Sequence, residues 1–149
     1  MIDRFGLLII LLSIVEYAIS WWLFIGRQNN LYGEIPSELG YLSEMRWFEI
    51  QDDYVIGTIP DALGTGWTKL HTFLVGGNFL HGFPQTFENN EMLGTIFIDR
   101  NRFNGTFPSV FETLKNLEWL DAENNAFVGE LPDGLGNLKS LSEFFLVQY

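Results

Sequence analysis

Apolar residues recur along most of this chain at one fixed set of positions. Counted from an anchoring asparagine or aspartate, they stand 11, 8, 5 and 3 positions before the anchor and 2 positions after it, and a glycine follows at position +4. The anchors are Asn29, Asp53, Asn78, Asn101 and Asn125. The five prolines of the chain follow one another at intervals of 24 residues, as Pro36, Pro60, Pro84, Pro108 and Pro132. A fixed period of this length predicts a solenoid in which each turn is one structural unit.

Each turn is expected to contribute one short β-strand. The apolar residues at positions −5 and −3 alternate with polar neighbours, and successive strands of this kind build a parallel sheet. The proline fixes φ and is expected to begin a tight helical turn. The glycine at +4 is expected where neighbouring backbones crowd together.

The anchors are predicted to form a ladder inside the solenoid. An asparagine amide both donates and accepts hydrogen bonds, so stacked asparagines satisfy backbone groups of adjacent turns. Each such group would otherwise cost about 1–3 kcal/mol when buried. An ionised Asp53 accepts but does not donate, so the sequence predicts that Asp53→Asn stabilises the fold.

The whole pattern, L-x-x-L-x-x-L-x-L-x-x-N-x-L-x-G-x-I-P-x-x-L-G, resembles the plant-specific type of leucine-rich repeat. Receptor-kinase ectodomains, polygalacturonase-inhibiting proteins and many algal and diatom proteins carry this repeat. The resemblance covers residues 23–149 in about five turns, of which the last is incomplete. It implies an α/β repeat solenoid, a right-handed superhelix with a parallel concave β-sheet and short 3-10 or irregular convex segments. It also implies a non-catalytic, protein-binding surface.

Residues 1–22 are predicted to form a separate hydrophobic helix. The run from Phe5 to Trp21 has a single charge, at Glu16, and with the apolar residues up to Ile25 it reaches about 20 residues, the usual length of a membrane span. Trp21 and Trp22 stand at its end, where an interfacial aromatic belt would place them. A membrane helix through residues 5–21 is therefore the favoured interpretation.

Two other interpretations of this segment are open. A helix that caps the solenoid is supported by Ser13, Glu16 and Ser20, which fall on one helical face. A cleaved signal peptide is disfavoured, because the apolar run is too long and no small-x-small cleavage site follows it.

Composition narrows the classes of partner. The net charge of −11 argues against a nucleic-acid partner, which would need Lys and Arg. The chain has no cysteine, so disulfides and thiolate metal sites are excluded. Asn104 begins the single glycosylation sequon. The repeats end on an open strand at Leu141 and Phe144, so further repeats or another subunit are expected to cover the C-terminal end.

The concave face is the expected binding surface, because it carries large apolar and acidic side chains that the core does not require. The predicted contact residues are Trp47, Glu49, Leu74, Phe97, Asp99, Trp119, Asp121, Glu123 and Phe145. The carboxylates of Asp99, Asp121 and Glu123 should lie together, where a solvated acidic face, a site for a basic peptide side chain and a Ca²⁺ site are the alternatives. No catalytic residue, resident metal or cofactor is expected, because His71 and His81 fall outside the concave columns without triad geometry.

The sequence thus predicts a non-catalytic binding or scaffold module that its N-terminal helix holds at a membrane or membrane complex. One alternative is a structural accessory subunit of a large membrane protein assembly. The other is a secreted, extracellular recognition fragment whose helix only caps the solenoid.

Overall fold

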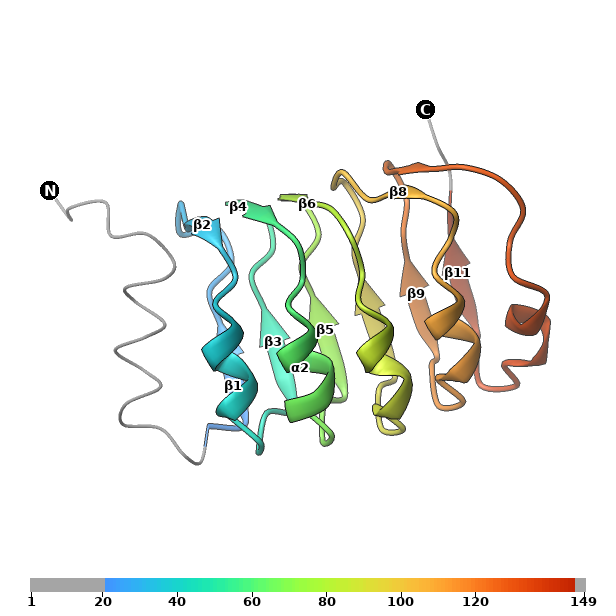
Figure 1. The fold of residues 1–149 in the computed structure, drawn as a ribbon, viewed down its shortest axis with the longest axis horizontal. Coiled ribbons are helices and arrows are strands. Elements are labelled where there is room, and N and C mark those ends of the chain that lie inside the picture. The colour runs from blue at the N-terminus through green and yellow to red at the C-terminus, as the bar shows by residue number, and fades with distance from the viewer. Residues whose placement is uncertain (1–20, 147–149) are drawn as a thin grey trace, which may run out of the picture.

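The computed structural model of the chain describes residues 21–146, which form a solenoid of stacked turns (Figure 1). One strand of each turn joins a six-stranded parallel sheet, in which every strand lies beside the strand of the next turn. Its strands are β1 (Leu23–Ile25), β3 (Trp47–Glu49), β5 (Thr72–Leu74), β7 (Thr95–Phe97), β9 (Trp119–Asp121) and β11 (Glu143–Phe145). The predicted parallel sheet and its register are confirmed, since Phe24 pairs with Phe48 and Ile96 with Leu120.

A second short strand in each turn follows the anchor residue. β2 (Tyr32–Glu34), β4 (Tyr54–Gly57) and β6 (Phe79–Leu80) form a parallel three-stranded sheet. β8 (Asn104–Gly105) and β10 (Ala126–Phe127) form a parallel pair. These strands lie along one edge of the solenoid (Figure 1).

The side opposite the long sheet consists of short helical segments. They are η1 (Ser37–Tyr41), α2 (Asp61–Gly66), η2 (Gln85–Asn89), η3 (Ser109–Thr113) and η4 (Asp133–Asn137). Each begins directly after one of the five prolines, as predicted, and those prolines have φ values between −59° and −77°. Four segments are 3-10 turns, whereas α2 is α-helical. The turn that contains α2 has one extra residue, between Pro60 and Trp67, and the longer helix accommodates it.

The glycines at position +4 are required for a different reason from the one expected. Five of them, from Gly33 to Gly129, have φ between +74° and +96°. A Cβ placed at Gly33 or Gly105 would meet no heavy atom within 4 Å. The left-handed backbone conformation, and not crowding, therefore selects glycine at these two positions.

A single aromatic-rich core runs through the stacked turns. Phe48 packs against both Trp67 and Phe73, with ring centroids 4.9 and 5.8 Å away. The fully buried Trp67 also donates its indole N–H to the Leu39 carbonyl at 2.8 Å, which satisfies a backbone group of η1. The core thus joins each turn to the next through ring contacts as well as through the sheet.

The predicted hydrophobic helix lies outside the described residues, apart from its last two positions. Trp21 and Trp22 have no regular secondary structure and are 40 % and 56 % exposed. Among residues 21–146, no helix has the length and apolar character needed to cross a membrane.

Candidate binding surface

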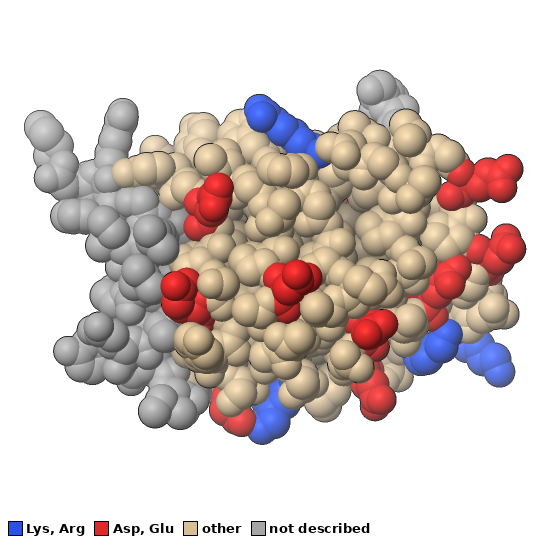
Figure 2. Space-filling view, in the orientation of Figure 1, with Lys and Arg blue, Asp and Glu red and all other residues tan. Residues whose placement is uncertain are grey.

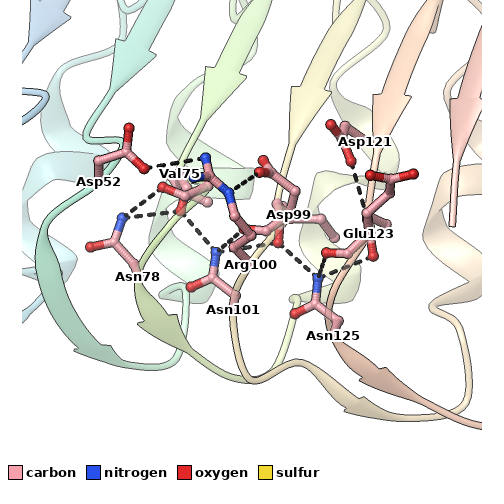
Figure 3. A network of polar contacts seen from close by, with 12 residues as sticks. Asp52, Val75, Asn78, Asp99, Arg100, Asn101, Asp121, Glu123 and Asn125 are labelled. Atoms are coloured by element: carbon pink, nitrogen blue, oxygen red, sulfur yellow. Dashed lines mark hydrogen bonds and ion pairs between the residues drawn. The ribbon is translucent and has the colours of Figure 1, made fainter. Parts of the chain in front are cut away.

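Three of the anchors, Asn78, Asn101 and Asn125, form hydrogen bonds between turns beneath the loops that follow the long sheet (Figure 3), whereas Asn29 is exposed. The amide nitrogen of Asn78 donates to the carbonyl oxygens of Ile50, Val75 and Gly76 at 2.7, 3.1 and 3.3 Å. Its amide oxygen accepts the backbone N–H of Val55 at 3.0 Å. One side chain therefore joins two turns and satisfies four backbone groups.

The next two anchors repeat this arrangement. Asn101 donates to three carbonyls, including that of Val75 at 2.9 Å, and accepts from the Leu80 N–H. Asn125 donates to Ile98 and to two carbonyls of its own turn, and accepts from the Phe103 N–H. This regular ladder holds the loops at the end of the sheet in a fixed position.

Asp53 interrupts the ladder, because an ionised carboxylate accepts hydrogen bonds but does not donate them. Its Oδ1 accepts the backbone N–H groups of Asn29 and Leu31, both at 2.9 Å. Its Oδ2 is buried and has no hydrogen-bond partner. Burial raises the pKa of the Asp53 carboxyl, and the backbone hydrogen bonds oppose that shift only in part. Asp53 is thus a weak position in the ladder.

The predicted concave residues divide into three groups, which are exposed, half-buried and buried. Trp47, Trp119 and Phe145 are 38 %, 47 % and 44 % exposed, so their large apolar side chains are available on the outer face of the long sheet. The half-buried residues are Phe97, Asp121 and Glu123. We call the exposed and half-buried group the concave aromatic–acidic surface.

Glu49, Leu74 and Asp99 differ from the expectation, because all three are buried. Glu49 is covered by Arg27, with which it forms an ion pair at 3.4 Å, and it accepts the indole N–H of Trp47 at 3.1 Å. Leu74 is flanked in register by Glu49 and Phe97 on the adjacent strands. Neighbouring side chains thus cover positions that a pattern of alternating residues assigns to the surface.

The carboxylate of Asp99 is buried because it occupies the space that a side chain at Gly76 would fill. A Cβ at Gly76 would collide with the Asp99 carboxylate, and a Cβ at Gly77 would collide with that of Asp52. Across this gap Arg100 forms ion pairs with Asp99 at 2.8 Å and with Asp52 at 3.2 Å (Figure 3). The role of Asp52 was not predicted from the sequence, although the glycine pair Gly76 and Gly77 on the next turn was the signal for it.

Replacing Gly77 with alanine should therefore destabilise the protein by about 1–2 kcal/mol. Gly77 has φ of +67°, and the added methyl group would displace the carboxylate of Asp52 from Arg100. Urea unfolding followed by circular dichroism measures the loss. Gly136→Ala is the matched control, since Gly136 lies in η4 with open space around it. Equal stability of the two variants would refute the expectation.

The three predicted carboxylates lie close enough to affect one another. Burial raises the pKa of Asp121, the backbone N–H of Glu123 opposes that shift, and the charges of Asp99 and Glu123 reinforce it. Asp121 Oδ1 accepts that N–H at 3.1 Å. Arg102 does not join this group, because it lies over the Phe79 ring at 4.5 Å. Within residues 21–146, no group of three or more acidic, His or Cys side chains is arranged to hold a metal ion.

Three other predicted positions lie away from this surface. Asn104, the glycosylation candidate, is exposed in β8. His71 and His81 are both exposed, as expected, and lie before β5 and after β6. On the helical side, Asp and Glu side chains are scattered among neutral residues without one concentrated patch (Figure 2).

Comparison with known proteins assigns the class of this fold. A family model described as Leucine Rich Repeat matches residues 116–138. The crystal structure of a TDR receptor superposes with a TM-score of 0.77 at 35 % identity, over 80 % of this chain and 21 % of the receptor chain. No curated protein sequence matches the chain. The chain thus contains a leucine-rich repeat and has the fold of a leucine-rich-repeat solenoid, as predicted.

Particular solved structures extend this likeness. The plant peptide hormone receptor RGFR1 in complex with RGF2 superposes with a TM-score of 0.74 at 29 % identity, over 80 % of this chain and 20 % of that chain. The ectodomain of the receptor kinase SOBIR1 from Arabidopsis thaliana gives 0.76 at 24 % identity, over 84 % and 67 %, which shows the fold alone. The chain spans about a fifth of the length of the TDR and RGFR1 chains.

Proposed function

We propose that this protein is a non-catalytic protein-binding module whose concave aromatic–acidic surface receives a protein or peptide partner. The observation that carries the proposal is the exposure of Trp47, Trp119 and Phe145 on one face of a rigid sheet. Trp and other large aromatic residues dominate the energetics of protein interfaces, because they bury a large area at little cost in conformational entropy.

The charge of this surface favours a basic partner. Asp121 and Glu123 form no ion pair within the described residues, whereas Asp99 is neutralised by Arg100. A lysine or arginine side chain beside Trp119 would meet a carboxylate and an aromatic ring together. The similarity to RGFR1, whose structure was determined in complex with RGF2, supports partner binding by a solenoid of this kind.

The N-terminal apolar run is proposed to hold the module at a membrane or membrane complex. Its support is the sequence of residues 5–21, with its single charge and its terminal tryptophans. In this arrangement residues 1–22 are the anchor and residues 23–149 the repeat domain. Alkaline carbonate extraction tests the anchor, and release of the full chain into the soluble fraction would contradict it.

Replacing Trp119 with alanine should weaken partner binding by at least about 30-fold, the effect of losing a 2 kcal/mol hot spot. Proteins recovered by the full chain would be purified, and their affinities measured by isothermal titration calorimetry. Ile56→Ala is the matched control, because Ile56 is 46 % exposed and lies in β4, outside the long sheet. Loss of affinity in the Ile56 variant but not in the Trp119 variant would contradict the proposed surface.

A further inference from the structure

The first turn of the solenoid carries a cluster of large exposed apolar side chains. Trp21, Trp22, Leu23 and Ile25 are 36 % to 56 % exposed, and we call them the first-turn apolar patch. Leu23 pairs in register with Trp47, and the backbone N–H of Trp47 donates to the Trp22 carbonyl at 3.0 Å. The patch is therefore contiguous, at the outer strand of the long sheet.

The charged residues beside the patch, Arg27 and Glu49, neutralise one another. Arg27 forms its ion pair with Glu49, and Glu49 also accepts the Trp47 indole N–H. Toward the other end of the same sheet lie the carboxylates of Asp121 and Glu123, which form no ion pair within residues 21–146. The first strand of the long sheet thus carries exposed apolar side chains beside a paired Arg27 and Glu49, whereas Asp121 and Glu123 lie near Trp119 toward the last strands.

The patch also lies immediately beside the apolar run of the sequence. Trp21 is the last residue of that run, and no Gly/Ser linker separates it from β1. At about 3.3 Å per residue, Ile25 lies no more than about 15 Å along the chain from Trp21, and Trp47 is on the strand about 4.8 Å away. If the run enters a bilayer and ends at its surface, the patch therefore begins at the interfacial layer.

We propose that the first-turn apolar patch docks into the interfacial layer of a lipid bilayer. Tryptophan prefers this layer because its ring is apolar and its indole N–H is polar. The first turn of the solenoid would then lie at the membrane surface, and Asp121 and Glu123 would lie away from it. This inference rests on the membrane anchor of the proposed function and adds a second, independent contact with the lipid.

The absence of cysteine permits a direct test. Ile25→Cys and Val128→Cys each introduce one thiol at an exposed apolar position, 54 % and 64 % exposed. Val128 is the matched control, because it follows β10 four turns away, about 19 Å at 4.8 Å per turn. Each full-length variant is labelled with a polarity-sensitive fluorophore and reconstituted in phosphatidylcholine vesicles that contain a shallow spin-labelled quencher lipid.

The inference predicts that the label at position 25 shifts to shorter wavelength and is quenched at least about twofold more than the label at position 128. Circular dichroism verifies that both variants are folded, and carbonate extraction of the same vesicles reports the anchor separately. Retention in the membrane with equal quenching at both positions would overturn the docked patch and leave the anchor intact. Release from the membrane would overturn both.

Discussion

Replacing Asn78 with aspartate should lower the free energy of unfolding by at least about 3 kcal/mol, the cost of burying an uncompensated charge. Asn78 is 4 % exposed and donates to three carbonyl oxygens. A carboxylate at this position would direct its negative charge at those oxygens and would leave all three without this donor. Urea unfolding at neutral pH, followed by circular dichroism, measures the loss.

The matched control makes the same chemical change at an exposed site. Asn137→Asp lies at the end of η4, where the added charge is solvated, and its stability should change by less than about 0.5 kcal/mol. If both variants unfolded at the same urea concentration, the ladder would not be a principal source of stability. The effect should also spread along the solenoid, since Asn78 joins its own turn to the preceding one.

The reverse substitution, Asp53→Asn, should raise the free energy of unfolding by about 1–3 kcal/mol. The amide keeps the oxygen that accepts from Asn29 and Leu31. It also replaces the buried Oδ2, which has no partner, with an NH₂ group that can donate to backbone carbonyls. By position in the repeat, the carbonyls available to that donor are those of Gly26, Ile50 and Gln51.

The gain should depend on pH with a defined sign. Because burial raises the pKa of Asp53, the folded protein binds this proton more tightly than the unfolded chain does. The destabilisation by Asp53 is therefore fully present above the raised pKa and is relieved as the pH falls through it. The difference in thermal midpoint between Asp53→Asn and the wild type should be largest at neutral pH and should shrink on acidification.

Glu91→Gln provides the control for the loss of one negative charge. Glu91 is exposed, so its replacement should change the midpoint little. A wild-type protein that equals or exceeds Asp53→Asn in stability at neutral pH would show that the unpaired carboxylate costs nothing.

Most of the fold was predictable because the repeat carries its information in local spacing. The distance between anchors determines which residues of adjacent strands face each other, so Leu23 and Trp47 could be paired from the sequence alone. The prolines likewise mark the start of every helical segment. The anchor ladder follows from hydrogen-bonding capacity, and the weakness of Asp53 follows from its missing donor.

The candidate site was less predictable, because exposure on the sheet depends on contacts between turns. Alternation places Leu74 and Asp99 on the outer face, yet residues of the adjacent strands flank Leu74, and Asp99 occupies the space beside Gly76. The bridge from Arg100 to Asp52 spans two turns and requires the missing side chain of Gly77. The residue pattern of a single turn does not show which side chains of different turns come into contact.

The extra residue in α2 shows how this fold accommodates an insertion. Its turn is longer than its neighbours, yet β5 keeps its alignment with β3 and β7. The insertion on the helical side is thus accommodated within its own turn. A change of length on the helical side can therefore leave the spacing of the strands in the long sheet unchanged.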